Sequence, residues 1–213
     1  MHRPGRTIFS LAAILAAFIM AATASAQGEL YREGVHYQQL DTPVRTADAE
    51  RVEVVELFWY GCPGCYTFEP YMQSWEASQE SEVDFKRLPA AWNPLMRIHA
   101  QAFYAAQALD AMDAVHDAFF NEYHRNRNRL QNEVQIREFF ESCGISQEDF
   151  DRVFNSFSVR TRVNQAERQM AQYGSAAQTP SIYVNGKYVV TTAVGSYQEM
   201  LNVVDYLVAL ESG

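Results

Sequence analysis

Apolar positions along the chain follow two periods, and the order of these periods predicts an α/β fold. Val52 to Trp59 is a nearly continuous run of β-branched and aromatic residues, which is typical of a strand covered on both faces. Helical spacing follows from Gly64 to about Ser78, and Val83 to Leu88 again indicates a strand. This β-α-β order implies parallel strands joined by a right-handed crossover. Gly34 to Leu40 is expected to add a short edge strand.

The middle of the chain carries helical spacing and no strand pattern. Turn-forming pairs such as Asn93-Pro94 and Cys143-Gly144 separate the helical segments. Ser146 and Asp149 resemble a capping box at the start of one segment, with Asp in place of Glu. The predicted helices are Ile98 to Leu109, Ala114 to Tyr123, Val134 to Cys143, Gln147 to Phe157 and Val159 to Tyr173.

A β-hairpin and a helix close the chain. Ser181 to Val184 and Lys187 to Val190 flank Asn185-Gly186, the pair that tolerates the positive φ angles of a type I′ turn. Ser196 to Leu210 is an amphipathic helix. With the β-α-β unit, these elements form the two halves of a thioredoxin-like fold, and the helical block is an all-helical domain inserted between them. The first half, the inserted domain and the second half are expected at residues 27–95, 96–173 and 174–213.

The N-terminus has the three-part layout of a secretory signal peptide. A basic start with Arg3 and Arg6 precedes an apolar run from Ile8 to Ala22, and small residues follow up to Ala26. The apolar run is shorter than the roughly 20 residues that a membrane-spanning helix needs. We expect residues 1–26 to be removed by cleavage near Ala26, with an uncleaved anchor as the alternative. Export places the cysteines where disulfides persist, and a bacterial periplasm is the expected compartment.

Composition and charge exclude several classes of protein. The chain of 213 residues is 48% hydrophobic and 20% charged, as in packed globular proteins. Its net charge is −9, and removal of residues 1–26 leaves 15 basic and 26 acidic residues, a net charge of −11. This acidic balance argues against a nucleic-acid-binding protein.

The candidate chemistry lies in Cys62-Pro63-Gly64-Cys65, directly after the predicted central strand and at the start of a helix. Cysteines three residues apart on a first helical turn lie on one side of the helix, within reach of a disulfide. Cys62 is expected at the N-cap and Pro63 at the first helical position, where proline is tolerated. Free N–H groups and the helix dipole then favour a nucleophilic thiolate on Cys62. Cys65, one turn further on, is expected to be the buried resolving thiol.

Two structural alternatives compete with this redox interpretation. The first is a disulfide between Cys62 and Cys65 without a catalytic role. The second is a zinc site, for which the pair would supply only half of the ligands. Cys143 stands alone and is expected to be a buried, unreactive thiol. The histidines beyond residue 26 do not show zinc-ligand spacing, so no metal is expected; they are His36, His99, His116 and His124.

Two segments resemble the DsbA family of periplasmic thiol–disulfide oxidoreductases. These are FWYGCPGCYTFEP at 58–70 and TPSIYVNGKY at 179–188, and the likeness extends over the helical insertion. The resemblance implies donation of a disulfide to exported proteins and reoxidation by a quinone-linked membrane partner. It implies no cofactor, because the cysteine pair is the redox centre, and we expect a monomer that binds reduced or unfolded chains.

The resemblance also assigns roles to residues beyond the cysteines. It implies a cis peptide bond before Pro180, which faces the cysteines, and an exposed Thr179 backbone that pairs with a substrate strand. Pro63 and Gly64 would contact the same substrate. Glu56, inside the apolar strand, would be a buried acid that exchanges a proton with Cys65. The charged residues that align near that acid in the family are Glu69 and either Lys86 or Arg87.

Two other functions remain open at this stage. One is a reductase or isomerase on the same fold, kept reduced in the cell; isomerases of this kind are usually dimeric, and no N-terminal dimerisation segment is evident. The other is a holdase or assembly factor with a structural disulfide. The redox state of Cys62 and Cys65 in the cell discriminates the first alternative, and a Cys62→Ser variant discriminates the second.

Gly64 departs from the Pro-His dipeptide that is commonest in the family. A histidine helps to stabilise the thiolate, and glycine has no side chain that could do so. We therefore predict a higher Cys62 pKa and a more reducing potential than in Pro-His relatives. Gly64→His should raise the reduction potential measured by equilibration with glutathione, and an unchanged or lower potential would contradict this expectation.

Overall fold

A computed structural model of the chain describes residues 30–79 and 81–213. The predicted signal peptide, residues 1–26, lies outside this part. The chain divides into two compact units, residues 1–32 and 33–213. The second unit contains the helices and strands of the described residues and the candidate site. Within the described residues, no helix is long and apolar enough to cross a membrane.

The second unit is built on a five-stranded mixed sheet with the order β1-β5-β4-β2-β3. β2 and β3 are parallel, whereas the other neighbouring pairs are antiparallel. Every residue of β2 is buried, so the central strand is as the apolar run predicts. The strands are β1 (Gln38–Gln39), β2 (Val52–Phe58), β3 (Val83–Pro89), β4 (Ser181–Val184) and β5 (Tyr188–Thr191).

Two strand predictions have different outcomes. The edge strand predicted at Gly34 to Leu40 is reduced to two residues, because Gly34 has φ +75° and its N–H donates to the Tyr37 carbonyl in a turn. The hairpin prediction is confirmed: Asn185 and Gly186 have φ +50° and +62° between β4 and β5. A Cβ at Gly186 would also lie 1.9 Å from the Val44 carbonyl oxygen, so only glycine fits there.

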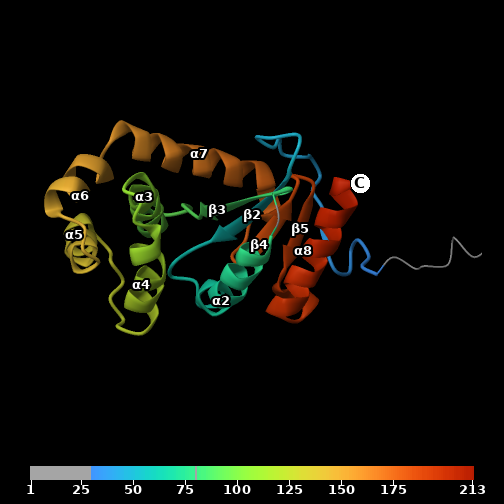
Figure 1. The fold of residues 1–213 in the computed structure, drawn as a ribbon, viewed down its shortest axis with the longest axis horizontal. Coiled ribbons are helices and arrows are strands. Elements are labelled where there is room, and N and C mark those ends of the chain that lie inside the picture. The colour runs from blue at the N-terminus through green and yellow to red at the C-terminus, as the bar shows by residue number, and fades with distance from the viewer. Residues whose placement is uncertain (1–29, 80) are drawn as a thin grey trace, which may run out of the picture. The chain divides into compact units, whose positions relative to one another are not determined.

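Helices α2 (Pro63–Ser78) and α8 (Tyr197–Ser212) pack side by side against the sheet (Figure 1). The Trp75 indole N–H in α2 donates to an Asp205 carboxylate oxygen in α8 at 2.7 Å. β2, α2 and β3 form the predicted β-α-β unit, while β4, β5 and α8 form the second half. The first turn of α2 is therefore presented at the end of the central strand.

A block of five helices separates β3 from β4 and lies at the side of the sheet that β3 borders (Figure 1). Four of its helices begin earlier than the apolar spacing predicts. At two of these starts the side chains of Asn93 and Ser156 accept hydrogen bonds from Met96 N and Val159 N, which extends the helix toward the capping residue. The helices are α3 (Pro94–Ala108), α4 (Met112–His124), α5 (Glu133–Ser142), α6 (Gln147–Phe154) and α7 (Phe157–Tyr173). The 3₁₀ turns are η1 (Gly174–Ala176) and η2 (Thr192–Val194).

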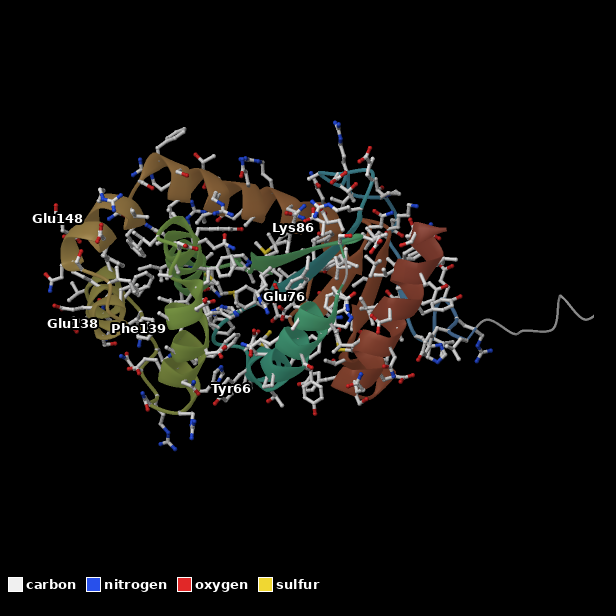
Figure 2. The ribbon with its side chains drawn as sticks, viewed as in Figure 1. Tyr66, Glu76, Lys86, Glu138, Phe139 and Glu148 are labelled. Atoms are coloured by element: carbon white, nitrogen blue, oxygen red, sulfur yellow. The ribbon has the colours of Figure 1, made fainter. Side chains whose placement is uncertain are left out.

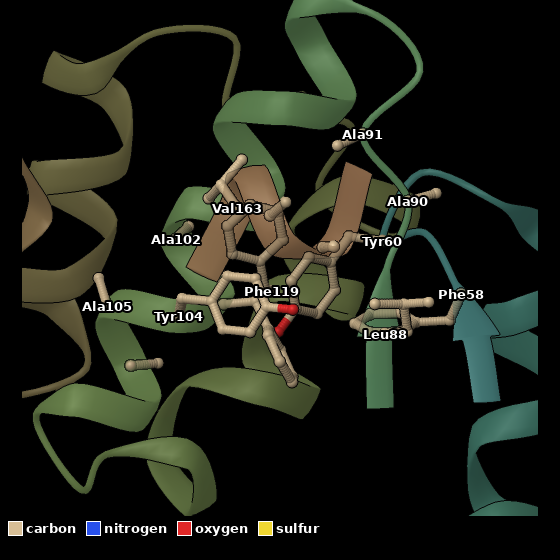
Figure 3. Close-up of a cluster of buried hydrophobic side chains, with 14 of the residues drawn as sticks. Phe58, Tyr60, Leu88, Ala90, Ala91, Ala102, Tyr104, Ala105, Phe119 and Val163 are labelled. Carbon is tan, nitrogen blue, oxygen red and sulfur yellow. The ribbon is translucent and has the colours of Figure 1, made fainter. Parts of the chain in front are cut away.

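Aromatic residues join the sheet to the helical block in one hydrophobic core (Figure 3). Tyr60, just after β2, stacks on Phe119 of α4 with ring centroids 4.2 Å apart. Phe58 at the end of β2 meets Phe103 of α3 edge-on at 5.4 Å. This packing fixes the end of the central strand from the side of the inserted helices. A thioredoxin fold with a helical insertion is confirmed, whereas the borders at residues 95 and 173 stay predictions.

Candidate active site

The site lies where β2 ends and α2 begins. Cys62 is the N-cap of α2, with extended backbone angles (φ −84°, ψ 117°), and Pro63 opens the helix as predicted. The Cys62 sulfur accepts a hydrogen bond from the Cys65 N–H at 3.4 Å. The sulfur thus takes the place of the oxygen that usually caps a helix and lies at the positive end of the helix dipole.

The Cys62 sulfur is half-buried and surrounded by hydrogen-bonding groups. The carbonyl oxygen of Thr179 lies 3.6 Å from Sγ. Hydrogen bonding from the Cys65 thiol, followed by the Thr179 side chain and the Cys65 and Gly64 amides, lowers the Cys62 pKa to about 5, although burial opposes the shift. Cys62 is therefore a thiolate at neutral pH, which is the nucleophilic form of cysteine.

Cys65 has the opposite character. Its side chain is fully buried, and both cysteines are free thiols in the structure. Burial raises its pKa well above the ordinary value, and the hydrogen bond to Cys62 and the negative charges of Cys62 and Glu56 add to this effect. The reduced pair therefore holds one thiolate, on Cys62, and one thiol, on Cys65.

The loop before β4 covers the cysteines from the other side. The Thr179–Pro180 peptide bond is cis, which confirms the sequence-based expectation. Pro180 is buried, whereas Thr179 stays partly exposed beside Cys62. Gly64 closely approaches this loop, because a Cβ built on it would lie 3.1 Å from Pro180 Cδ. The site therefore combines the four residues of the motif with Thr179 and Pro180.

Glu56 is fully buried in β2, below the cysteine pair. It lies opposite Arg87 in the parallel register of β2 and β3, and parallel neighbours place their side chains on one face. The Arg87 Nε atom is 3.4 Å from a Glu56 carboxylate oxygen. Burial raises the pKa of Glu56 to about 8, Glu69 adds to the shift, and Arg87 opposes it. Glu56 is thus a protonated acid at neutral pH.

Glu69 of α2 and Arg87 complete a buried ionic layer. Arg87 donates to a Glu69 carboxylate oxygen at 3.0 Å, and His116 Nε2 lies 3.3 Å from the same oxygen. Burial alone would raise the Glu69 pKa, but hydrogen bonding with His116 and the positive charges of His116 and Arg87 lower it. This layer borders a cavity of about 810 Å³ between the sheet and the helical block.

The structure distinguishes Lys86 from Arg87, which the sequence leaves as alternatives. Lys86 projects from the other face of β3, where it pairs with Glu53 and with Asp84 at 2.8 Å. Figure 2 labels Lys86 close to α7, whereas Glu76, another partner of Arg87, lies on α2. Arg87 is therefore the cation of the layer beneath the cysteines, and Lys86 belongs to a separate ionic pairing.

Three histidines of the helical block hold the loop that precedes Cys62. The Trp59 indole N–H donates to His99 Nδ1 at 3.1 Å. The Tyr60 hydroxyl is hydrogen-bonded to His116 Nδ1 at 2.8 Å, and His124 Nε2 donates to the Tyr60 carbonyl at 2.8 Å. The spacing of these histidines along the chain bears only on metal binding and does not reveal this role. Their contacts join positions at least 40 residues apart in the chain.

Tyr66 provides a further link from α2 to the helical block. Its ring stacks on His124 with centroids 4.7 Å apart, and its hydroxyl donates to Asn121 at 3.0 Å. Figure 2 labels Tyr66 between α2 and α4. Within residues 30–79 and 81–213, no group of three potential metal ligands is close enough to hold an ion.

Cys143 is the C-cap of α5. It is half-buried against the hydrophobic core and is therefore more exposed than expected.

Comparison with known proteins places these features in a family. Residues 53–204 match the model of the DSBA-like thioredoxin domain. The chain is 33% identical over 188 residues to the thiol:disulfide interchange protein DsbA of Pseudomonas aeruginosa, covering 88% of this chain and 89% of that protein. It is 35% identical over 179 residues to DsbA of Azotobacter vinelandii, with coverage of 84% and 83%.

Solved structures agree with the sequence matches. The crystal structure of Pseudomonas aeruginosa DsbA superposes with a TM-score of 0.80 at 33% identity, over 85% of this chain and 94% of that chain. The oxidoreductase DsbA from Xylella fastidiosa superposes with a TM-score of 0.77 at 31% identity, over 85% and 98% of the two chains.

The buried His99 predicts a pH dependence of stability. Its Nδ1 accepts from Trp59, so its proton lies on Nε2, which donates to the Arg129 carbonyl at 3.0 Å. Burial lowers the pKa of His99 to about 4 from 6.5, so the unfolded chain binds more protons between these pH values. The folded state should lose up to about 3 kcal/mol as the pH falls through this window.

His99→Asn should remove this contribution. Urea unfolding at pH 7 and pH 4 measures it as the extra loss of stability in the wild-type protein relative to the variant. Both proteins carry the same other titrating groups, so those contributions cancel in the comparison. Equal losses in the two proteins would contradict the assignment of a neutral, buried His99.

Proposed function

The chain belongs to the DsbA-like thioredoxin-domain family and is a thiol–disulfide oxidoreductase, and on this premise we propose that it donates the Cys62–Cys65 disulfide to reduced exported proteins. The observation that supports this direction is the asymmetry of the two sulfurs. Cys62 has its pKa lowered to about 5, whereas the pKa of Cys65 is raised by burial. A stabilised Cys62 thiolate stabilises the reduced form, which makes the disulfide form an oxidant.

The reaction proceeds in two exchange steps. A substrate thiolate attacks Cys62 Sγ, a mixed disulfide forms, and the Cys62–Cys65 bond breaks with Cys65 leaving as a thiolate. The second thiolate of the substrate then attacks the substrate sulfur of the mixed disulfide. A substrate disulfide forms, and Cys62 leaves as the thiolate that the helix N-terminus stabilises. The substrate dithiol loses two electrons as its disulfide forms, and the same two electrons reduce the Cys62–Cys65 disulfide.

Glu56 is the proposed proton donor to the leaving Cys65. With a pKa raised to about 8, its carboxyl carries a proton at neutral pH, and its negative charge would raise the Cys65 pKa further. Transfer of this proton to the Cys65 thiolate neutralises a buried charge that the interior does not solvate. The positive charge of Arg87 then stabilises the Glu56 carboxylate until it is protonated again.

Substrate binding is assigned to the surface around Cys62. Thr179 presents its backbone 3.6 Å from the Cys62 sulfur, where an extended substrate segment can pair with it. Pro63 and Gly64 form the helix side of the same surface. Main-chain pairing suits a protein that accepts many reduced or unfolded chains, because every peptide carries the same backbone groups.

We place the protein in the periplasm after cleavage near Ala26, because export supplies both an oxidising compartment and newly arrived thiols. A quinone-linked membrane protein is the proposed reoxidant of Cys62 and Cys65. The enzyme needs no cofactor or metal, acts as a monomer, and has no nucleic-acid partner.

A pair of cysteine variants tests this function. Cys62→Ser removes the nucleophile and should lower the rate of peptide dithiol oxidation below about 1% of wild type. Cys143→Ser is the matched control, since it removes the third thiol away from the site, and it should keep the wild-type rate. Retained activity in Cys62→Ser would overturn the mechanism and favour the holdase.

Thiol trapping in cells tests the direction of electron flow. A mostly oxidised Cys62–Cys65 pair is expected, whereas a mostly reduced pair would indicate a reductase or isomerase.

A further inference from the structure

Tyr197 is brought to the active site by the turn before α8. Gly195 has φ +107°, a conformation that favours glycine and reverses the chain after η2. Ser196 then caps the helix by accepting the Glu199 N–H at 3.1 Å. Tyr197 is thereby the first residue of α8 and lies against the first turns of α2.

Two aromatic rings hold the Tyr197 ring in place. It stacks on Phe68, which is fully buried, with centroids 5.0 Å apart and an interplanar angle of 25°. Tyr71 packs on it at 5.7 Å with an angle of 50°. A ring fixed between two others has little freedom to turn, so the direction of its hydroxyl is set by the packing.

The Tyr197 hydroxyl borders a notch that exists because residue 64 is glycine. The position of a Cβ at Gly64 lies 3.5 Å from the Tyr197 hydroxyl oxygen and 3.7 Å from the Cys62 sulfur. It lies 3.1 Å from Pro180 Cδ, so three residues of the site frame this position. An atom of a substrate bound to Cys62 can enter the notch and touch the hydroxyl.

The hydroxyl is a free donor beside the notch over Gly64. Within the described part of the chain, no group accepts or donates a hydrogen bond to the Tyr197 hydroxyl, and Cys62 Sγ is not its partner. Burial, and then the negative charges of Cys62 and Cys65, raise the pKa of Tyr197. The group therefore keeps its proton at neutral pH, and the folded chain leaves it free to donate to an acceptor on a bound substrate.

We propose that Tyr197 is a substrate-binding residue whose hydroxyl donates a hydrogen bond to a main-chain carbonyl beside the reacting cysteine of the substrate. This inference rests on the proposed function. A substrate sulfur bonded to Cys62 lies about 2 Å from Sγ, and the carbonyls flanking that cysteine are then within reach of the notch over Gly64. Every protein substrate carries such a carbonyl, so the contact serves substrates without regard to sequence.

Tyr197→Phe tests the proposal, because it removes the hydroxyl and keeps the ring between Phe68 and Tyr71. The oxidised enzyme is assayed with a model peptide that contains two cysteines and with dithiothreitol, which has no peptide group. The variant should lose about threefold to tenfold in kcat/KM for the peptide, mainly through KM. Its rate with dithiothreitol should equal the wild-type rate, which also shows that the variant is folded.

Tyr71→Phe is the matched control, a hydroxyl deletion on the neighbouring ring, and should keep wild-type kinetics with both substrates. An unchanged kcat/KM of Tyr197→Phe for the peptide would overturn the proposal. An equal loss with peptide and dithiothreitol would also overturn it, because the hydroxyl would then act on the sulfur itself. A wild-type enzyme that oxidises neither substrate would instead refute the proposed function, so the two failures are distinguishable.

Discussion

The interaction on which the site depends is the hydrogen bond from the N-terminus of α2 to the Cys62 sulfur. Backbone amides at a helix N-terminus have no partners within the helix, and a thiolate satisfies them while it gains the favourable dipole. Cys62 can do so only because β2 delivers it to the cap position and Pro63 opens the helix behind it. The histidines that hold Trp59 and Tyr60 keep this junction in place. The helical insertion thus supports the redox centre through the loop that it holds.

The second constraint is the buried ionic layer below the cysteines. Removing charges from water is costly, and the layer persists because Arg87 faces both Glu56 and Glu69. One carboxyl of this pair has its pKa raised and the other has its pKa lowered, so the two acids hold different protonation states at neutral pH. The pKa of Cys65, which lies above them, is raised, as is the pKa of Glu56. A proton can therefore be exchanged between these two buried groups at little cost in charge separation.

Local signals were sufficient for the parts of the molecule that the sequence predicts well. The Cys62 cap and the Asn185-Gly186 turn each depend on residues adjacent in the chain, whereas the cis bond before Pro180 was expected from the family resemblance. Apolar spacing does not predict the helix starts at Pro94 and Phe157, because each start is set by the polar capping residue that precedes the helix. The choice between Lys86 and Arg87 depends on the register of β3 against β2, which places the Arg87 side chain on the same face as Glu56 and the Lys86 side chain on the other face. The roles of the three histidines and of Tyr197 come from contacts between distant segments, which no local pattern contains.

The most direct test of this account is a titration of the Cys62 thiolate in the reduced enzyme. The rate of alkylation of Cys62 by iodoacetamide is measured against pH, with mass spectrometry assigning the modified cysteine. The structure predicts a midpoint near the pKa of about 5, well below the ordinary value of 9.0, with Cys65 unmodified throughout. A midpoint at the ordinary value would mean that the Cys65 thiol and the helix N-terminus do not hold a thiolate on Cys62, and would contradict the account.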